Sequence, residues 1–387
     1  MINCAVCGSR NIIFFNRFAD YPLTNLYLDV PSKDEKYKAN LEVYQCHCGH
    51  IQANSFFDSK NIYTTDYPYN GSASGVVARR DKGVSLIKKN VTCNRLNTIV
   101  DIGCGQLEMI NLVRKQFSAN RIIGLDPVPL RMNLDDLGDI EFYNEYFTGA
   151  NFRLSVGDGP NLFMLDNVLE HVPDPNSFLS NLNDCTALGD FIYVCVPSCE
   201  SMLMKLQFQE LIHEHVHYFS IPILNELLGR HGFKSVESCC DATGSRGYNY
   251  ILYVKSHDSR NEGSPSSPCG TFENAFNNYS AMLDLSLRHI DTLPSDIWGV
   301  CASELTPTLS YHMKSDLSFC RAILDTSSNK LNKYMPGIQP RIIDMGSIRE
   351  IPHENWFFIT APSVGRQVVS NLTNQGVSNI ILPIAIF

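Results

Sequence analysis

The sequence predicts an α/β fold, with a doubly wound sheet in its middle and a second, smaller sheet of the same kind near its C-terminal end. From residue 97 onward, short β-rich runs alternate with helical patterns, and this alternation is typical of βαβ units in a parallel sheet. A chain of 387 residues is also longer than one hydrophobic core usually fills, so two or three domains are expected.

Three blocks of different composition give the expected domain limits. Residues 1–75 are rich in Asn, Tyr and Cys, show little helical periodicity and predict a small N-terminal module. The alternating pattern of the middle domain fills 76–257, and that of the C-terminal domain fills 270–387. Between these two domains, residues 257–270 are rich in Ser, Pro and Gly, which is the composition of a linker.

The individual elements follow from the same periodicity. In the middle domain the expected elements are a strand over 98–100, a helix over 107–116 and strands over 121–125, 161–165 and 190–196. In the C-terminal domain a helix over 272–290 precedes expected strands over 297–300, 322–324, 356–359 and 379–382. A Ser-Ile-Pro run at 220–222 predicts an N-cap before a helix over 224–231.

The composition excludes several classes of protein. Apolar residues make up 44% of the chain and charged residues 18%, which is enough apolar material for a buried core and excludes a wholly disordered chain. A net charge of −9 and a sequence pI near 5.6 argue against binding nucleic acid through a basic face. No apolar run reaches the roughly 18–20 residues that cross a membrane, and the first residues lack the features of a secretion signal. A cytoplasmic protein is expected, and its oligomeric state stays open.

The fourteen cysteines fall into two groups. Four of them form the pairs Cys4-x-x-Cys7 and Cys46-x-Cys48. The other ten are scattered and are interpreted as small core residues. They are Cys93, Cys104, Cys185, Cys195, Cys199, Cys239, Cys240, Cys269, Cys301 and Cys320.

The two cysteine pairs predict a structural zinc site. Four thiolates can surround Zn²⁺ tetrahedrally, and a small module that is poor in aliphatic residues needs such a metal to fold. Four protein ligands leave no position open for catalysis. The second pair is one residue tighter than a usual zinc knuckle, so His47 or His50 could replace one cysteine, and four unliganded thiols are the alternative.

A glycine loop follows the first strand of the middle domain. The run Asp101-x-Gly103-x-Gly105 lies between a β-rich run and a helix, where glycines let the backbone approach a ligand at a helix N-terminus. Asp126 ends the next strand, at a spacing typical of an acidic residue that binds ribose hydroxyls. A dinucleotide site would need a third glycine, where this chain has Glu108, and a glycine turn that binds nothing is the other alternative.

This loop resembles motif I of the class I S-adenosylmethionine-dependent methyltransferases. The resemblance implies that Asp101 orders the loop and the methionine end of the cofactor, and that Asp126 binds the cofactor's ribose. The run LDNVLEHVPD at 165–174 is similar to the segment that follows the fourth strand in those enzymes. The implied cofactor is S-adenosylmethionine, and the expected cofactor-binding residues are Asp101, Gly103, Gly105, Asp126 and Asn167.

Over nearly its whole length the chain resembles the nucleotide-sugar C-methyltransferase family. The matching runs are YPLTN at 21–25, CGHIQ at 48–52, YPYNGSAS at 67–74, QFQELIHEHVHYFS at 207–220 and KYMPG at 333–337. The resemblance implies a zinc module, a Rossmann-like methyltransferase domain and a Rossmann-like C-terminal domain. The implied substrate is a small molecule, a deoxy-keto-sugar carried on TDP, which is methylated on carbon through an enolate.

The run HEHVH at 213–217 has three interpretations. It fits the zincin pattern HExxH only if it is helical, whereas its β-branched and aromatic neighbours predict an extended loop. Plain surface histidines in a loop are the second interpretation. The resemblance supports the third, in which His215 is the general base and Glu214 its partner, while Tyr69 or Tyr67 donates a hydroxyl to the enolate.

Departures from the family pattern concentrate where substrate contacts are expected. Ile212 lies where the family has Tyr, which removes one candidate donor to the enolate. The runs WGVCASE at 298–304, TAP at 360–362 and TGSRG at 243–247 replace a glycine-rich loop, an AWN run and a GGSxR run. Methylation of oxygen or nitrogen therefore stays open. A zinc-stapled binding protein with a vestigial methyltransferase domain is the non-enzymatic alternative, which the intact glycine loop argues against.

Overall fold

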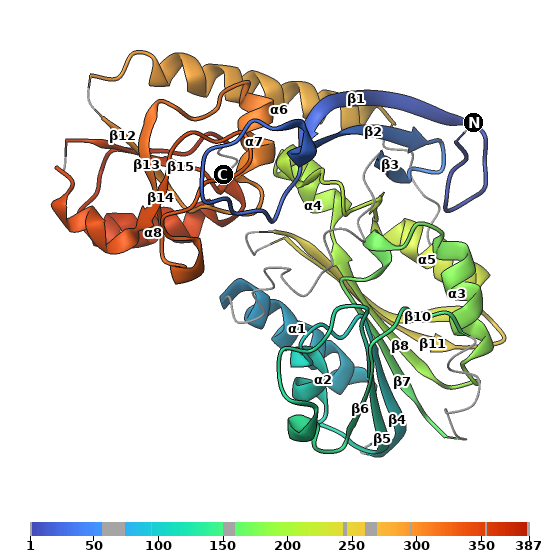
Figure 1. Ribbon diagram of the computed structural model, residues 1–387. Helices are drawn as coiled ribbons and strands as arrows, with labels where there is room; N and C mark the ends of the chain where they lie inside the picture. The colour runs from blue at the N-terminus through green and yellow to red at the C-terminus, as the bar shows by residue number, and fades with distance from the viewer. Residues whose placement is uncertain are drawn as a thin grey trace.

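Three β-sheets organise the computed structural model, which describes residues 2–55, 74–93, 95–149, 159–242, 246–259, 269–294, 296–352 and 354–384. Figure 1 shows the middle sheet in the lower part of the molecule, with the N-terminal and C-terminal sheets above it.

The N-terminal sheet is antiparallel and includes one strand from much later in the chain. Its order is β1 (Ile12–Pro22), β2 (Lys38–Cys46), β3 (Ile51–Ser55) and β9 (His217–Tyr218). In β2 the buried residues Leu41 and Val43 alternate with less buried ones, as expected for a strand with one face on a core. The pairing of β3 with β9 attaches the segment before β9 to the N-terminal module.

The middle sheet has the strand order β10-β11-β8-β7-β4-β5-β6. Its strands are β4 (Arg95–Ile102), β5 (Ser118–Leu125), β6 (Ile140–Tyr143), β7 (Leu162–Asp166), β8 (Phe191–Pro197), β10 (Phe233–Asp241) and β11 (Tyr248–Lys255). β11 is antiparallel to both of its neighbours, and the other strand pairs are parallel. The chain runs from β4 to β5 and β6 on one side and continues with β7 and β8 on the other. The switch point of the sheet therefore lies between β4 and β7.

Helices cover both faces of the middle sheet. They are α1 (Ser74–Asn90), α2 (Glu108–Val113), α3 (Pro175–Asp184) and α5 (Ile221–Arg230). The short helix α4 (Cys199–Met204) instead packs in a core that it shares with β1 of the N-terminal sheet. α1 and α2 share a core with one face of the sheet, and α3 and α5 share a core with the other. With both faces covered, the central strands are continuous apolar runs, and Phe163, Met164 and Leu165 of β7 are all fully buried.

The C-terminal sheet is parallel, in the order β14-β13-β12-β15-β16. Its elements are α6 (Cys269–Ile290), β12 (Ile297–Val300), α7 (Thr306–Met313), β13 (Cys320–Asp325), β14 (Ile342–Asp344), β15 (Trp356–Ile359), α8 (Gly365–Asn374) and β16 (Ile380–Ile381). Its switch point lies between β12 and β15. Short 3-10 helices elsewhere are η1 (Glu35–Tyr37), η3 (Leu134–Leu137), η4 (Leu169–His171), η5 (Phe208–Glu210), η6 (Ser328–Lys330), η7 (Met345–Glu350) and η8 (Pro362–Val364).

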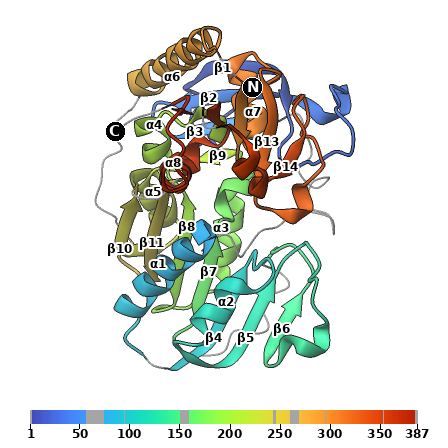
Figure 2. The same cartoon turned by 90° about the vertical axis from the view of Figure 1, so that its left-hand side faces the viewer.

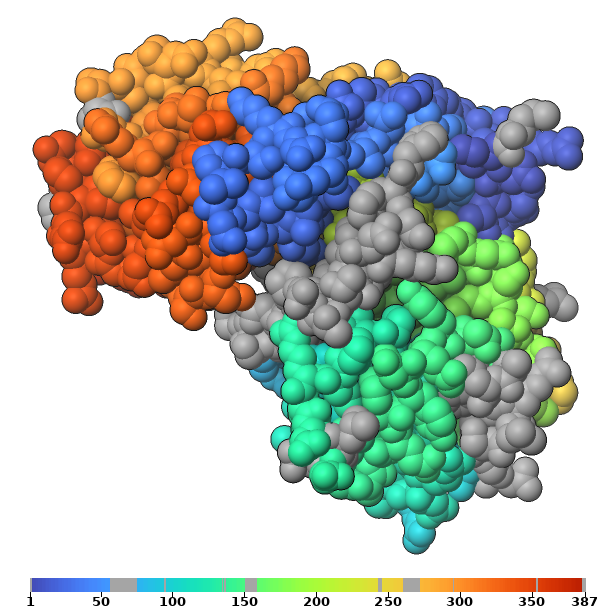
Figure 3. Space-filling view, in the orientation of Figure 1, coloured from blue at the N-terminus to red at the C-terminus, as the bar shows by residue number. Residues whose placement is uncertain are grey.

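The N-terminal module packs against both other parts of the chain. Phe18 and Tyr21 of β1 share one hydrophobic core with Phe272 and Tyr279 of α6. At its other end, Cys4, Val6 and Cys46 join the core of α3 and α5. Figure 3 shows the module in blue, in contact with the orange C-terminal part on one side and lying over the green middle part on the other.

Several elements differ from those expected from the sequence. The helix expected over 107–116 is the shorter α2, because Leu107 has a left-handed φ of 70° and precedes the helix. The helix expected over 224–231 begins at Ile221, and Ser220 occupies its N-cap without a side-chain hydrogen bond. The strand β14 and the hairpin β10–β11 were not expected. The linker expected over 257–270 lies mostly outside the described residues.

The scattered cysteines are not all core residues. Cys104, Cys195, Cys199 and Cys320 are buried as expected, and Cys93, Cys185 and Cys301 are half-buried. Cys239 and Cys240 are exposed, because they lie on β10 at the edge of the middle sheet. Within the described ranges, no helix is long and apolar enough to cross a membrane.

Candidate active site

A cavity of about 1410 Å³ lies where the carboxyl ends of the middle and C-terminal sheets face each other. The loops that follow β4, β5 and β7 line one side, and the loops that follow β12, β13 and β15 line the other. Figure 2 shows the middle sheet in the lower part of the molecule and the C-terminal elements, α8 among them, above it. Doubly wound sheets bind ligands at this edge, so the cavity is the candidate active site.

The loop after β4 brings its backbone close to the cavity. Gly103 has a φ of 74° and Gly105 a φ of 55°, a conformation that favours glycine. A Cβ atom on Gly103 would lie 2.6 Å from Cγ2 of Val168, so a larger residue does not fit there. The N–H of Gly103 donates to the carbonyl of Leu125 at 2.8 Å, which fixes the loop against β5.

Asp126 follows β5 beside this loop. Its carboxylate accepts one hydrogen bond from the N–H of Gly105 and one from the N–H of Val128, each at 2.8 Å. Each oxygen keeps a second lone pair, which a ligand in the cavity can use. Burial raises the pKa of Asp126, and the two backbone N–H groups oppose that rise. This fixed carboxylate has the position and the acceptors to bind the two hydroxyls of a ribose.

Asp101 is a fully buried carboxylate in β4, and neither of its oxygens has a hydrogen-bond partner among the described residues. Burial raises the pKa of Asp101 well above its ordinary value, and the charge of Asp166 adds to the rise, whereas Arg80 opposes it. A buried carboxylate without partners is costly, so a cationic ligand group bound nearby would stabilise its charged form. The ammonium and sulfonium groups of S-adenosylmethionine are cations of this kind.

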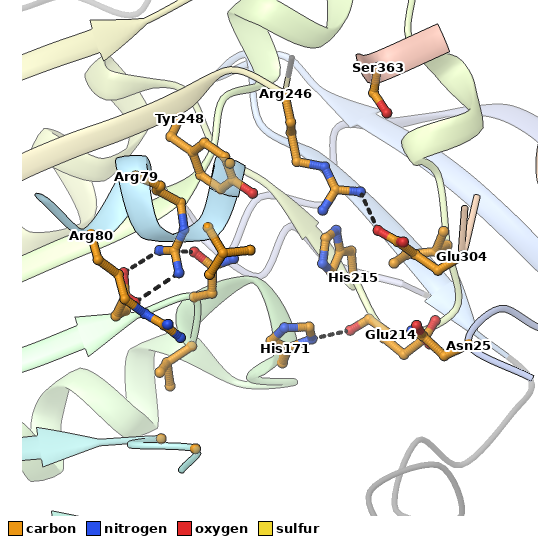
Figure 4. Close-up of a pocket in the computed structure, with 18 of the residues that line it drawn as sticks. Asn25, Arg79, Arg80, His171, Glu214, His215, Arg246, Tyr248, Glu304 and Ser363 are labelled. Carbon is orange, nitrogen blue, oxygen red and sulfur yellow. Dashed lines mark hydrogen bonds and ion pairs between the residues drawn. The ribbon is translucent and has the colours of Figure 1, made fainter. Parts of the chain in front are cut away.

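A buried ion-pair network lies next to Asp101 and was not expected from the sequence. Arg79 of α1 donates to both carboxylate oxygens of Asp166 in β7 and, at 3.0 Å, to Oδ1 of Asn167 (Figure 4). The Nε atom of Arg80 lies 3.7 Å from Oδ2 of Asp166. The network therefore holds Asn167, which has a φ of 60°, at the cavity wall. No helix had been expected over α1, and so its two arginines were missed.

His215 also lines the cavity, and its ring meets the ring of His171 edge-on with centroids 4.9 Å apart (Figure 4). Burial lowers the pKa of His215 well below its ordinary value, and the nearby His171 and Arg246 add to that fall. The imidazole is therefore neutral near pH 7 and can accept a proton. Among the described residues, no side-chain hydrogen bond holds this ring.

The carboxylate of Glu214 faces the N-terminal module and not the ring of His215. It accepts hydrogen bonds from Oγ1 of Thr24, at 2.9 and 3.1 Å, and from Nδ2 of Asn25 at 3.4 Å. The backbone carbonyl of Glu214 accepts a hydrogen bond of 2.9 Å from Nδ1 of His171, so that nitrogen carries a proton. His171 lies within the run expected to follow the fourth strand. No local pattern indicates that His171 meets His215, because the two residues are far apart along the chain.

The other two histidines of the HEHVH run do not form a zincin site. Nε2 of His213 lies 3.2 Å from the carbonyl of Tyr21, whereas Nδ1 of His217 lies 3.1 Å from Nε2 of His50. The segment is not helical, which confirms the expected loop. All three histidines of the run are buried, so the interpretation as surface histidines is wrong.

Arg246 links the middle part of the cavity wall to the C-terminal part. It forms an ion pair with the buried Glu210, and its Nη2 atom lies 3.9 Å from Oε1 of Glu304. Ile212 lines the same cavity with an apolar side chain. Tyr67 and Tyr69 lie outside the described residues, so the hydroxyl donor expected from one of them stays a prediction.

The four paired cysteines come together at the end of the N-terminal module. The Sγ atoms of Cys4 and Cys48 are 3.8 Å apart, those of Cys7 and Cys46 are 3.6 Å apart, and all four lie within 4.8 Å of one another. Four sulfurs at about 2.3 Å from a tetrahedral Zn²⁺ are separated by about 3.8 Å. The arrangement therefore fits a zinc ion, and neither flanking histidine belongs to the cluster.

Comparison with known proteins identifies one domain of the chain. Residues 78–238 match the family model of the methyltransferase domain. The C-methyltransferase NovU of Streptomyces niveus is 23% identical over 238 residues, which are 60% of this chain and 56% of that protein. The chain thus spans little more than half the length of this curated relative.

Solved methyltransferases resemble part of the chain. The N-methyltransferase NodS of Bradyrhizobium japonicum, solved with S-adenosylhomocysteine, matches 51% of this chain and 95% of its own, at 11% identity and a TM-score of 0.36. The 1,6-didemethyltoxoflavin-N1-methyltransferase of Burkholderia thailandensis matches 46% of this chain and 79% of its own, at 15% identity and a TM-score of 0.36. The likeness to these two structures is too low to define the class of protein. The class instead follows from the match to the methyltransferase-domain family. Residues 78–238 form a methyltransferase domain of the S-adenosylmethionine-dependent class.

Proposed function

We propose that the protein transfers the methyl group of S-adenosylmethionine to a carbon atom of a nucleotide-linked keto sugar. The observation that carries this proposal is the large cavity, in which the glycine loop of the methyltransferase domain faces the loops of a second doubly wound sheet. One side suits the cofactor, and the other suits the nucleotide of a substrate. The relative NovU is named a C-methyltransferase, which supports carbon as the methylated atom.

The residues between the two sides suit proton removal. S-adenosylmethionine supplies a methyl group on a positively charged sulfur. In the proposed reaction the neutral ring of His215 takes the proton from the carbon beside the ketone, and the C–H electron pair becomes an enolate. That carbon then bonds to the methyl group, and the C–S electron pair stays on sulfur. Glu214 positions the base through the backbone, because Thr24 and Asn25 hold its side chain.

We further propose that Cys4, Cys7, Cys46 and Cys48 hold one structural Zn²⁺. The metal site lies at one end of the sheet that contains β9, and the base lies just before β9. The zinc therefore stabilises the module that holds the base in place.

The reaction is tested by incubating the protein with methyl-labelled S-adenosylmethionine and a panel of nucleotide-linked keto sugars. We expect mass spectrometry to find the label on a carbon of the sugar. Label on no member of the panel, despite tight binding of S-adenosylhomocysteine, would contradict the proposed substrate class. If S-adenosylhomocysteine does not bind, the result would instead support a binding protein whose methyltransferase domain is vestigial.

Methylation of oxygen or nitrogen is the second candidate function, and Ile212 is the observation that favours it. An enolate needs hydrogen-bond donors, and Ile212 supplies none where the resembling family has a tyrosine hydroxyl. A heteroatom acceptor would still need a base such as His215 but would form no enolate. Fragment ions of the labelled product distinguish a methyl group on carbon from one on oxygen or nitrogen.

Asp126→Ala should weaken the binding of S-adenosylmethionine by about 1–3 kcal/mol, because hydrogen bonds to a charged group are lost. Asp101→Ala should act in the same direction, with some added loss of stability. Asp139→Ala is the matched control, since Asp139 is an exposed carboxylate that pairs with Arg114 outside the cavity. Calorimetric titration measures all three variants, and unchanged affinity in both cavity variants would show that the glycine loop is not the cofactor site.

A further inference from the structure

The loop after β12 repeats the backbone arrangement of the glycine loop after β4. In the middle sheet, the N–H of Gly103 donates to the carbonyl of Leu125 at 2.8 Å. In the C-terminal sheet, the N–H of Cys301 donates to the carbonyl of Leu324 at the same distance. The φ angles of Gly103 and Cys301 are 74° and 73°. Two loops with unrelated sequences thus take the same turn at the same place in their sheets.

The carboxylates that follow these loops are held in the same way. Asp325, at the end of β13, accepts hydrogen bonds of 2.8 Å from the N–H of Ala302 and from the N–H of Ser327. Asp126 accepts two bonds of the same length, also from the preceding loop and from the residue two positions later. The two side chains are similarly buried, at 6% and 8% exposure, and both line the cavity.

The turn at Cys301 is unusual for a residue with a side chain. A left-handed φ is costly for residues other than glycine, and such residues concentrate at binding sites. Cys301 keeps this conformation next to the cavity, where its N–H is bonded to Leu324. The conformation presents the following N–H, that of Ala302, to Asp325.

We infer that Asp325 binds the vicinal 2′- and 3′-hydroxyls of a ribose, so that the nucleotide of the substrate is a ribonucleoside diphosphate. This inference rests on the proposed function, in which the methyl acceptor is nucleotide-linked. An acidic residue at the end of the second strand of a doubly wound sheet binds a ribose diol in this way. Each oxygen of Asp325 has one lone pair beyond its backbone hydrogen bond. A deoxyribonucleotide such as TDP lacks the 2′-hydroxyl and would leave one oxygen without a partner.

Cationic side chains near Asp325 suit the diphosphate. Lys330 lies 3.7 Å from Asp325, and Arg366 in the first turn of α8 lines the same cavity. Lys205 lines it from the middle domain. Burial lowers the pKa of Lys205, Asp241 opposes the fall, and the charge of Arg366 adds to it, so Arg366 and Lys205 are close enough to interact. Two like charges that face one cavity are stabilised by a bound anion.

The inference is tested on the full chain by calorimetric titration with UDP, GDP, CDP and ADP, each paired with its 2′-deoxy counterpart, and with TDP. At least one ribonucleotide should bind about 10- to 100-fold more tightly than its deoxy counterpart, the range expected for losing a hydrogen bond to a charged group. Equal binding within every pair, or TDP binding more tightly than all the ribonucleotides, would overturn the inference.

Two variants at equivalent positions separate the two sites. Asp325→Asn should reduce nucleoside diphosphate binding about tenfold or more and leave the affinity for S-adenosylhomocysteine unchanged, whereas Asp126→Asn should do the reverse. Unchanged nucleotide affinity in Asp325→Asn would overturn the inference. Absence of nucleotide binding alongside tight binding of S-adenosylhomocysteine would overturn it too, without touching the methyltransferase proposal. Ribose-selective binding without methyl transfer to any nucleotide sugar would support the inference and contradict the proposed function.

Discussion

His215→Gln should lower turnover about 10²- to 10⁴-fold, the usual effect of losing a general base, and leave the affinity for S-adenosylhomocysteine unchanged. Glutamine retains hydrogen-bonding groups and a similar size but cannot take up a proton near pH 7. The neutral ring of His215 lines the cavity beside His171 and belongs neither to the glycine loop nor to the aspartates expected to bind the cofactor, so cofactor binding should not depend on it. Steady-state kinetics and calorimetric titration give the two quantities separately.

The matched control for this variant is His213→Gln, two residues earlier in the same loop. His213 is buried against Tyr21 and does not line the cavity, so its replacement should lower the melting temperature more than the turnover. Wild-type turnover in His215→Gln on the true acceptor would show that His215 is not the base. Exchange of deuterium into the acidic carbon of the sugar, catalysed by the wild type alone, would show the proton removal directly.

The pH profile offers a second test of the same residue. Because the folded protein holds the pKa of His215 well below its ordinary value, the ring stays neutral as the pH falls from 8 to 6. Turnover should therefore be nearly constant over this range. A histidine with an ordinary pKa near 6.5 would instead lose activity through protonation below pH 7.

Cys46→Ser should remove the zinc ion and most of the activity. The binding free energy of structural zinc is about 10–16 kcal/mol in zinc-finger peptides, and much of it is folding free energy. Metal analysis of the wild type should find about one zinc per chain, and the variant should have almost none. Its melting temperature should fall, and turnover should fall further than the affinity for S-adenosylhomocysteine, because the module holds Glu214 through Thr24.

The control for the zinc prediction is Cys239→Ser. Cys239 is exposed on β10 and lies far from the cysteine cluster in sequence, so metal content and turnover should stay at wild-type values. Absence of zinc from wild-type protein purified without chelators would contradict the metal site. Loss of zinc from Cys46→Ser with full turnover would contradict its link to the catalytic segment.

Local patterns in the sequence were enough to predict that the glycine loop and Asp126 lie together. Asp101, Gly103, Gly105 and Asp126 lie within 26 residues, on one strand–loop–helix–strand unit whose geometry follows from its own sequence. The cysteine cluster was predictable for a different reason, since thiolates at knuckle spacing have few other uses.

The region around His215 depends on contacts between distant segments, which no local pattern shows. His171 reaches the backbone of Glu214 across 43 residues, and Thr24 reaches its carboxylate across 190. Arg79 lies on a helix whose apolar periodicity is weak, so neither the helix nor its ion pair was expected. Asp325 was not predicted as a binding residue, because the loop before it turns at Cys301 and not at the glycine that typically marks such a turn.

The strand β9 is synthesised long after β3, the strand with which it pairs. His50 and His217, which meet beside the β3–β9 pair, are 167 residues apart in the chain. A ribosome that adds about 5–20 residues per second needs about 10–30 s to cover that distance. Throughout this time the nascent N-terminal sheet presents the edge of β3 without its β9 partner, and unpaired edges attract other strands. Chaperone dependence during translation should therefore be greatest between the synthesis of β3 and that of β9.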